Sequence, residues 1–482
     1  NKVTEQEEEV KLEGQGKAFQ LIIHKRKLSK LTCGEYLLLL YPEEGAELRV
    51  SALREEKELW KGVNEKKGWD IKLPGKNQVS LKVDKKNVAY ISIREKGRPE
   101  GFLDKWKVTC AKLLAKIYRR VQKEPVWLIG EEMGRIAQDN GYAFFQYCIK
   151  EKKRKHAYYV TQKRNPDLDR VCADKKFFVL YGSVRHIMLH FVCDYYIVAH
   201  GIKDVMPPCF HDGIKNNKKP VIYLQHGITG MERVKFKGNY YNSTIKRFIV
   251  SSQQEKQICL RYMQFREEQV AVTGLARFDG LRDLSEETRG REILIMPTWR
   301  DWSIDSREAF RKSLFYQNYK KLLENQALHQ ELREHNVCLV FYPHLKIREG
   351  YLDMFQPMEN DVVKIAGSGT ATVAERLKRA DMLITDYSSV AFDFASMGKP
   401  VCFFQFDKDE YLRNRGTYVS FEQQLPGEIA EGIEELLERI REYVEQDFQP
   451  KELYMERLKK FVDFADRRNC ERIYESIISL KR

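Results

Sequence analysis

Val221-Ile-Tyr-Leu-Gln-His-Gly-Ile-Thr-Gly230 is a run of β-branched and aromatic residues that breaks directly into a histidine and glycines. Such a run is typical of a buried parallel strand, and open α/β sheets bind their ligands outside the carboxyl ends of the strands. We therefore interpret His226 as a candidate catalytic residue and Gly227 as a position where the backbone leaves room for a substrate. An ordinary strand-to-loop turn explains this stretch, taken alone, equally well.

Strand-like runs alternate with helical patterns from residue 126 onward, which predicts α/β domains built on parallel sheets. The first series comprises the runs 126–129, 157–161, 177–181, 195–199, 221–225, 247–250 and 270–273. The second series comprises the runs 293–296, 338–342, 362–365, 382–385 and 401–405. The last part, residues 428–482, has helical spacing and is expected to form two or three helices that close against one of the sheets.

The fold class predicted from this order is α/β, with two Rossmann-like domains around a central cleft and a β-rich accessory domain before them. The accessory domain is placed at residues 1–101, because Gly, Pro, Asn and Lys separate short strand-like runs there. These runs are 19–23, 36–41, 48–53, 79–83 and 88–93. The two Rossmann-like domains are placed at residues 123–285 and 286–482.

Residues 102–122 combine apolar and basic side chains at helical spacing and predict a basic amphipathic linker helix. Such a helix can lie on an anionic membrane surface, or it can pack on the next domain with its basic face in solvent. The chain of 482 residues has 84 Lys and Arg against 70 Asp and Glu, and its formal net charge of +14 favours an anionic partner. Nucleic acid is not expected, because no nucleic-acid-binding motif is present.

The ten cysteines are dispersed without a Cys-x-x-Cys pair, which favours a reducing cytosol and no structural zinc. The longest apolar segment, residues 187–199, is interrupted by His190 and Asp194 and is shorter than the roughly 20 residues of a membrane span. We expect no membrane-spanning segment and no signal peptide. P-loop, dinucleotide-binding and Gly-x-Ser-x-Gly motifs are absent, which disfavours an ATPase, a dehydrogenase or a hydrolase of those types.

The strand expected at 382–385 is followed by Ser388 and Ser389, which are suitable N-caps for a helix. Amides and hydroxyls at a helix start can bind an anion such as a pyrophosphate, although N-capping without a ligand explains the same residues. Arginines near other strand ends could bind the same anion or be surface or structural residues; they are Arg277, Arg300 and Arg415.

His344 follows a predicted strand directly after a proline, which orients its side chain into the cleft. A histidine there can donate to a phosphate or transfer a proton near neutral pH. His226 and His344 would then face each other across the cleft. No cluster of metal ligands accompanies them, so the sequence requires no metal, although Mg²⁺ could screen a bound pyrophosphate.

Several strand-end motifs occur in order along the two predicted domains. They are Ala137-Gln-Asp-Asn-Gly141, Tyr223-Leu-Gln-His-Gly-Ile-Thr229, Thr273-Gly-Leu-Ala-Arg-Phe-Asp279, Met296-Pro-Thr-Trp-Arg-Asp301, Tyr342-Pro-His344, Thr385-Asp-Tyr-Ser-Ser389 and Arg415-Gly-Thr-Tyr418. In these motifs and their spacing, the sequence resembles the CDP-glycerol glycerophosphotransferases, which build the poly(glycerol phosphate) or related polyol phosphate chains of teichoic acids. The resemblance covers roughly residues 126–420 and leaves the β-rich region without a function.

The resemblance implies a glycosyltransferase-B-like pair of domains on a cytoplasmic protein that is peripheral on the inner face of the cell membrane. It implies that a hydroxyl of a lipid-linked glycan or growing teichoic acid chain attacks the β-phosphorus of CDP-glycerol and expels CMP. We expect His226 to act as the general base on that hydroxyl and His344 to stabilise the phosphates or the leaving CMP. No cofactor is implied beyond possible Mg²⁺.

The remaining expected contacts divide between donor and acceptor. Residues expected at the donor are Arg277, Thr298, Arg300, Thr385, Asp386, Ser388, Ser389 and Arg415. Thr385 and Asp386 either contact the donor or only shape the loop. Residues expected at the acceptor are Gln138, Asp139, Asn140 and Gly227. A capped turn before the next helix is the competing explanation for Asp139 and Asn140.

Other functions stay open at the level of the sequence. CDP-ribitol could replace CDP-glycerol, and a nucleotide-sugar glycosyltransferase could use the same fold, because a pyrophosphate site does not identify the transferred group. A noncatalytic binder of an anionic polymer is a remote alternative that the positive charge motivates. The acceptor, the number of units added and the oligomeric state stay open as well.

Overall fold

The structure is a computed structural model that divides into two compact units, Asn1–Val108 with Pro208–Gly213, and Thr109–Pro207 with Ile214–Arg482. The residues that it describes are 102–480, apart from 168–175, 235, 237, 239–243, 288–289, 301, 303–305 and 368–370, together with residue 99 and the strand segments between 12 and 95. Among these residues, none of the helices combines the length and apolarity that crossing a membrane requires.

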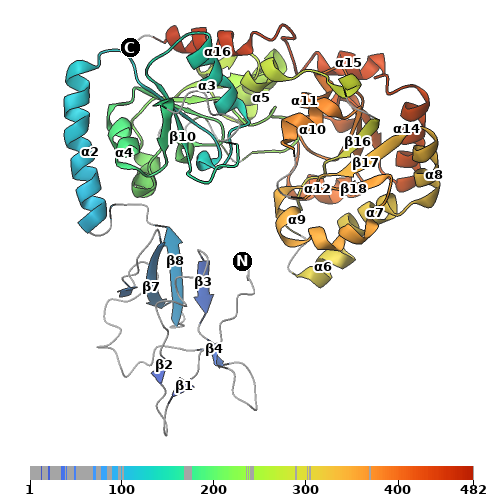
Figure 1. Cartoon of the computed structure of the whole chain (residues 1–482), viewed down its shortest axis with the longest axis horizontal. Coiled ribbons are helices and arrows are strands. Elements are labelled where there is room, and N and C mark those ends of the chain that lie inside the picture. Colours follow the sequence, from blue (N-terminus) through green and yellow to red (C-terminus); the bar gives the residue numbers. More distant parts are fainter. Residues whose placement is uncertain are drawn as a thin grey trace. The chain divides into compact units, whose positions relative to one another are not determined.

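The N-terminal unit contains short antiparallel strands, of which four form a sheet in the order β3-β8-β7-β6 (Figure 1). The strands are β1 (Leu12–Glu13), β2 (Gln20–Leu21), β3 (Gly34–Leu37), β4 (Leu39–Leu40), β5 (Leu48–Arg49), β6 (Trp69–Ile71), β7 (Asn77–Val83) and β8 (Ala89–Glu95). Each predicted run before residue 101 overlaps one of them, and the other residues of those runs lie outside the described residues. The boundary between the two units falls inside helix α2 (Phe102–Val121), and the predicted domain boundaries stay predictions.

The first sheet of the larger unit has seven parallel strands in the order β11-β10-β9-β12-β13-β14-β15. They are β9 (Trp127–Gly130), β10 (Ala157–Thr161), β11 (Phe178–Leu180), β12 (Tyr195–Val198), β13 (Val221–Tyr223), β14 (Ile245–Val250) and β15 (Val270–Val272). The helices of this first α/β domain include α3 (Asn140–Lys150), α4 (Val184–Val192), α5 (Gln253–Tyr262) and the 3₁₀ helix η9 (Ala276–Gly280). Strands β9 and β10 are buried throughout, as expected of a parallel sheet covered on both faces.

The second α/β domain has six parallel strands in the order β18-β17-β16-β19-β20-β21. They are β16 (Arg291–Ile295), β17 (Val337–Phe341), β18 (Val363–Ile365), β19 (Met382–Thr385), β20 (Val401–Phe404) and β21 (Glu428–Ala430). Its helices are α6 (Arg307–Lys312), α7 (Leu314–Leu323), α8 (Gln326–Glu334), α9 (Leu345–Gly350), α10 (Val373–Arg379), α11 (Val390–Ala395), α12 (Lys408–Asn414), α13 (Phe421–Gln424), α14 (Ile433–Glu445) and α15 (Glu452–Leu458).

Alternation along the second sheet divides its side chains between two apolar clusters. In β16, Ile293 and Ile295 belong to the cluster that includes buried residues of α7, α8 and α14, whereas Leu294 belongs to the cluster with residues of α10 and α11. The latter cluster also contains Ile129 and Ile222 of the first sheet, so one apolar core joins the two α/β domains. The predicted fold class is confirmed, and the cleft expected between the domains stays a prediction.

Strand β21 was not predicted, because only two or three helices were expected within residues 428–482. Its first residue, Glu428, is buried and forms ion pairs with Arg439 and Lys451. A buried charge at the start of a three-residue strand hides the apolar pattern that identifies the other strands.

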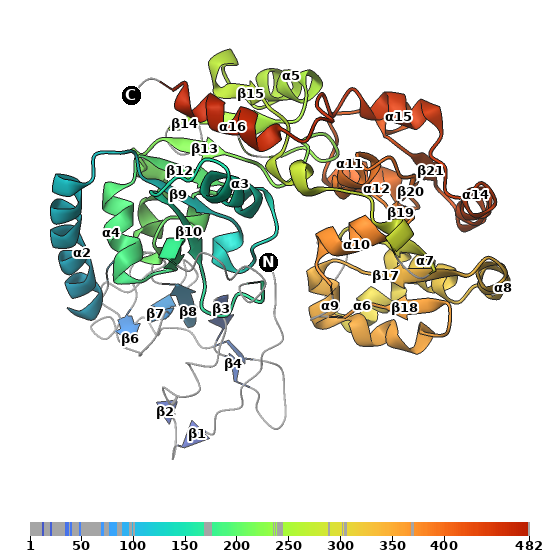
Figure 2. The ribbon, with the colours of Figure 1, turned by 45° about the horizontal axis from the view of Figure 1, so that its top comes forward.

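The last helix, α16 (Asn469–Ile478), packs against α3 and η9 of the first α/β domain, although the sequence places it with the second. Figures 1 and 2 both show this red helix beside α3. The backbone amides of Asn469 and Cys470 donate to the two carboxylate oxygens of Asp279, each at 2.8 Å. Gly274, with a φ of +80°, is required where α16 arrives, because a Cβ there would collide with Asn469.

Replacing Asp279 by alanine should loosen α16, because both acceptors at its first amides are lost. We expect the free energy of unfolding to fall by about 1 kcal/mol, measured by urea denaturation of the whole chain. Asp353→Ala is the control, since that carboxylate makes an exposed ion pair with Arg307 and should leave the midpoint unchanged. Equal midpoints for the two variants would contradict the capping role.

Candidate active site

His226 lies in a strained turn that follows β13. Gln225, directly before it, has a φ of +62°, a left-handed conformation that residues with a side chain rarely adopt. Buried groups hold its side chain: Nε2 donates to Glu255 Oε1 at 3.1 Å, and Oε1 accepts from Thr229 Oγ1 at 2.8 Å. Burial raises the pKa of Glu255, while hydrogen bonds from Thr229 and Ser251 lower it. The backbone that carries His226 therefore has a fixed course.

The imidazole of His226 stacks on that of His200, with ring centroids 4.9 Å apart and an interplanar angle of 14°. Its ring nitrogens have no hydrogen-bond partner in the part of the chain that the structure describes. The residue is exposed, yet desolvation by surrounding protein atoms lowers the pKa of His226 to about 4; His200 and Arg277 also lower it, and Asp139 raises it. The ring is therefore neutral at physiological pH and can accept a proton.

His200 follows β12 as His226 follows β13, and a glycine comes after each. Its Nδ1 accepts from the backbone N–H of Glu132 at 3.3 Å, which leaves the proton of the neutral ring on Nε2. Nε2 lies 3.6 Å from both Glu132 Oε2 and Asp139 Oδ2. The sequence analysis missed His200, although the same His-Gly pair at neighbouring strand ends was a usable signal.

Arg277 connects the two α/β domains beside His226. Its Nε and Nη2 donate to the two carboxylate oxygens of Asp393 in α11, at 2.6 and 2.9 Å. Its Nη1 donates to Asp139 Oδ1 at 2.7 Å and to the carbonyl of His226 at 2.9 Å. Burial alone would lower the pKa of Arg277, but Asp393 and Asp139 raise it above its usual range. The contact of Arg277 with a donor phosphate stays a prediction. Asp393 was not singled out as a site residue, because its pairing with Arg277 joins residues 116 positions apart.

Asp139 and Asn140 hold the start of α3 and the turn at His226. Asp139 is the N-cap of α3 and accepts from the amide of Asn140 at 2.7 Å. The buried Asn140 donates from Nδ2 to the carbonyl of Gln225 at 2.8 Å and accepts from the amide of Arg277 at 2.9 Å. These contacts correspond to the capped-turn explanation, and contact with an acceptor stays a prediction.

Gln138 precedes this cap, and its backbone amide donates to the buried carboxylate of Glu131 at 2.7 Å. Asp139 and Tyr142 donate their amides to the same carboxylate. Burial and the nearby Asp139 raise the pKa of Glu131, while these amides lower it. Gln138 Nε2 donates to Asp167 Oδ2 at 3.4 Å, and the contact of Gln138 with an acceptor stays a prediction.

Gly227 and Ser389 bring the two domains into close contact. A Cβ at Gly227 would collide with Ser389 Oγ, so the absence of a side chain at Gly227 allows this close approach. Room for a substrate at Gly227 stays a prediction. Ser388 Oγ accepts from the amide of Val390 at 3.3 Å, whereas Ser389 makes no capping hydrogen bond with its side chain. Of the two serines, Ser388 alone therefore caps α11, and the hydroxyl of Ser389 lies at the turn of His226.

Arg300 is buried, with 2% of its side chain exposed, and forms ion pairs with Asp386 at 2.9 Å and Asp407 at 2.7 Å. Asp386 also accepts from the backbone amide and the hydroxyl of Thr298. The described polar contacts of Arg300 and Thr298 lie inside the domain, and their contact with the donor stays a prediction. Asp407 was missed, since it follows β20 without a recognisable motif.

The other predicted residues lie at strand ends or loops of the second domain. Thr385 donates from Oγ1 to the carbonyl of Met296 at 2.7 Å, and so shapes the end of β19. His344 is exposed and caps α9, its Nδ1 accepting from the amide of Lys346 at 3.2 Å; burial and then Lys346 lower its pKa. Arg415 forms an ion pair with Glu232 at 2.6 Å. The predicted meeting of His226 and His344 stays untested.

Residues 113–479 match the model of the family described as CDP-Glycerol:Poly(glycerophosphate) glycerophosphotransferase. The chain belongs to this family. The resemblance inferred from the strand-end motifs is therefore confirmed, and it extends through α16.

Curated relatives in this family differ in the polyol that their names give. The chain is 27% identical over 390 residues to the minor teichoic acid biosynthesis protein GgaB of Bacillus subtilis, which covers 78% of this chain and 42% of that protein. It is 30% identical over 186 residues to a teichoic acid glycerol-phosphate transferase of Staphylococcus aureus, covering 38% of this chain and 44% of that protein. It is 29% identical over 158 residues to a teichoic acid poly(ribitol-phosphate) polymerase of Bacillus spizizenii, covering 33% of this chain and 24% of that protein. The chain spans less than half the length of these relatives.

A solved structure of the wall teichoic acid polymerase TagF has the same fold. It superposes with a TM-score of 0.54 at 19% identity and covers 79% of this chain and 98% of that one. The glycosyltransferase-B-like architecture expected for the family is thus supported by a structural relative.

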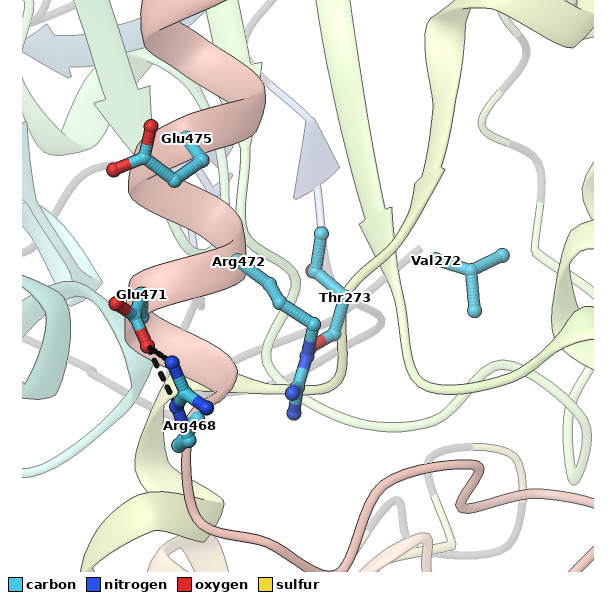
Figure 3. A pocket seen from close by; sticks show the side chains of 6 residues that line it. All are labelled: Val272, Thr273, Arg468, Glu471, Arg472 and Glu475. Atoms are coloured by element: carbon cyan, nitrogen blue, oxygen red, sulfur yellow. Dashed lines mark hydrogen bonds and ion pairs between the residues drawn. The ribbon is translucent and has the colours of Figure 1, made fainter.

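A pocket of about 570 Å³ lies elsewhere, between β15 and α16 (Figure 3). Ion-paired side chains line it, including Arg468 with Glu471, and Arg472 Nε donates to the carbonyl of Thr273 at 2.9 Å. None of the residues predicted for catalysis or binding lines this pocket. Among the described residues, no group of three His, Cys, Asp or Glu side chains is placed to hold a metal ion.

Asp393→Ala should destabilise the protein, because it leaves the guanidinium of Arg277 buried with one carboxylate fewer. We expect the free energy of unfolding to fall by about 3 kcal/mol, measured by guanidinium denaturation. Asp361→Ala removes the exposed ion pair with Arg333 and serves as the control, with no expected change. Wild-type stability of Asp393→Ala would exclude a structural role for the Arg277 pairing.

Proposed function

We propose that the chain transfers glycerol phosphate from CDP-glycerol to a hydroxyl of a lipid-linked glycan or growing teichoic acid chain, releasing CMP. The observation that carries this proposal is the contact of the turn at His226 and Gly227 with Ser389. This contact brings His226, whose ring nitrogens bond to none of the described residues, next to the hydroxyl-bearing loop between β19 and α11. Membership of the family supports the same reaction class.

In the proposed reaction, the acceptor hydroxyl oxygen attacks the β-phosphorus of CDP-glycerol. A new P–O bond forms, the bond from that phosphorus to the bridging oxygen breaks, and CMP leaves with the electron pair. His226 takes the proton of the hydroxyl, which its low pKa allows because the ring is neutral. Phosphoryl transfer of this kind depends chiefly on positioning and on donors to the phosphate oxygens.

The proposed donor contacts are Ser388, Ser389 and His344, whose groups lie at carboxyl ends of strands in the second domain. Arg277, Arg300, Thr298 and Asp386 are proposed to hold these loops in place, because their described partners are protein groups. Gln138 and Asp139 are proposed to lie near the acceptor, since Asp139 is linked to His226 through Arg277.

The transferred group is proposed as glycerol phosphate, with ribitol phosphate from CDP-ribitol as the second candidate. One relative is named for glycerol phosphate and another for ribitol phosphate, and they match this chain at 30% and 29% identity. Sequence similarity therefore does not decide between CDP-glycerol and CDP-ribitol as the donor. A nucleotide-sugar donor is the third candidate, because the fold accommodates either chemistry.

His226→Ala should lower the rate of CMP release from CDP-glycerol by about 10²- to 10⁴-fold, the usual contribution of a general base. Release is measured with a synthetic lipid-linked acceptor present, in parallel with CDP-ribitol and UDP-sugars, and with and without EDTA to test for Mg²⁺. Near-wild-type turnover in the variant would remove His226 from catalysis, and turnover of a UDP-sugar alone would replace the proposed donor.

Replacing Ser388 and Ser389 together by alanine tests the proposed donor contacts. Calorimetry should show weaker CDP-glycerol binding in this double variant, whereas His226→Ala should bind the donor like the wild type. Product mass then reports whether one unit or many are added.

We further propose that the protein is peripheral on the inner face of the cell membrane, through helix α2. Trp106, Leu113 and Ile117 share one face of this helix and are 55%, 62% and 53% exposed. Ala111 and Ala115, on the opposite face, are buried. An apolar face turned outward is typical of helices that lie in a membrane interface.

Basic side chains flank this apolar face of α2. Lys105, Lys112 and Lys116 follow one another at spacings that place them along one edge of it. Lysines in this position lie near anionic lipid headgroups, which are abundant in the cytoplasmic leaflet. Charge and apolar exposure therefore favour one partner, an anionic bilayer.

The double variant Leu113→Glu with Ile117→Glu should bind vesicles of phosphatidylglycerol at least about tenfold more weakly than the wild type, because the apolar face is lost. Cosedimentation measures the binding, and phosphatidylcholine vesicles should bind neither protein. Leu453→Glu with Ile478→Glu is the matched control, since these residues are 57% and 50% exposed on α15 and α16. Equal losses in both double variants would rule out α2 as the docking surface.

A further inference from the structure

We propose that His200 is a positioning residue, whose ring fixes the plane in which His226 presents its nitrogen to the acceptor hydroxyl. The inference rests on the proposed function and deepens it, since it assigns a second histidine to the same site. Neither the strand-end motifs nor the family match assigns a role to this residue.

The stacked geometry carries the inference. The two rings lie 4.9 Å apart with planes only 14° from parallel, so rotation of the His226 ring about its χ2 angle would drive it into His200. His226 has no ring hydrogen bond in the described part of the chain, whereas its backbone carbonyl is held by Arg277. The stack on His200 therefore restrains this ring.

The backbone and the ring of His200 are both held by hydrogen bonds or nearby charges, so its ring can restrain that of His226. Its backbone N–H donates to Asp204 at 2.8 Å, and its carbonyl accepts from Tyr223 at 2.5 Å. Its Nδ1 accepts from the amide of Glu132, and its Nε2 lies near the carboxylates of Glu132 and Asp139. Both backbone and ring are thus fixed, and the restraint is transmitted to His226.

The carboxylate of Asp139 links His200 to the contact between the two α/β domains. Asp139 places Oδ2 near His200 and accepts from Arg277 with Oδ1. Arg277 in turn pairs with Asp393 of α11. The position of the His200 ring therefore depends on the same ionic network that holds Ser389 beside His226.

The charged groups around the two rings decide how the stack responds to acid. They come from four segments and are Glu132, Asp139, Asp204 and Arg277. Removing the His200 ring exposes one face of His226 to water and removes a neighbour that lowers its pKa. The pKa of His226 should then rise from about 4 toward its ordinary value.

The first test compares turnover of His200→Ala and His200→Phe with that of the wild type. His200→Ala should lower kcat by about 10- to 100-fold with the donor KM little changed, because the ring of His226 loses its orientation. His200→Phe keeps a flat ring and should restore most of kcat. Wild-type kcat in His200→Ala, or equal kcat losses in both variants, overturns the proposal.

His156→Phe is the matched control, because His156 is also a half-buried histidine of the first α/β domain beside a carboxylate. Its side chain is 22% exposed against 28% for His200, and Nε2 lies 3.8 Å from Glu124. This variant should keep wild-type kcat and an unchanged pH profile. A loss as large as that of His200→Ala would mean that the effect is only structural.

The second test does not use turnover. NMR titration of the His226 ring should give an upward pKa shift in His200→Ala and none in His156→Phe. An unchanged titration in His200→Ala overturns the positioning contact. If the wild type turns over none of the donors while this shift is found, the proposed function fails and the contact between the histidines stands.

Discussion

The pairing of Arg277 with Asp139 and Asp393 is the interaction on which the site depends. A desolvated guanidinium is tolerated only while carboxylates compensate its charge, so the two α/β domains must keep the spacing that this pairing sets. The bidentate contact with Asp393 fixes direction as well as distance. Because Arg277 also holds the carbonyl of His226, the position of the candidate base and the contact between the domains are set by one side chain.

A second constraint acts from inside the first sheet. The left-handed backbone at Gln225 costs on the order of 1–3 kcal/mol, and it persists because Glu255 and Asn140 bind the groups that this conformation presents. Strained backbone next to a histidine whose ring bonds to none of the described residues is the combination expected where geometry serves chemistry rather than stability. The buried carboxylate of Glu255 thus acts on His226 only through the course of the chain.

The sequence predicts the fold well because apolar strands of a parallel sheet stand out from their polar connections, as at 293–296 and 382–385. It fails at β21, where Glu428 is buried by ion pairs, and at α16, whose packing partner depends on long-range contacts. Within the candidate site, motifs in the sequence mark His226 and Ser389, whose roles stay predictions. Asp393 could not be found in this way, because its role arises only from pairing with a residue more than 100 positions away.

The positive charges of Arg277 and Arg300 are compensated inside the protein. Arg277 and Arg300 each face two carboxylates, so neither brings net charge to a nearby pyrophosphate. The donor recognition proposed at Ser388 and Ser389 would then rest mainly on hydroxyl and backbone N–H groups, which bind phosphate without a strong long-range field. The net charge of +14 is instead available at exposed surfaces such as the lysine edge of α2. The two proposals, attraction of α2 to an anionic surface and recognition of a donor phosphate at the serines, thus involve different parts of the molecule. Changes in salt concentration should therefore weaken the proposed surface attraction more than the proposed phosphate binding.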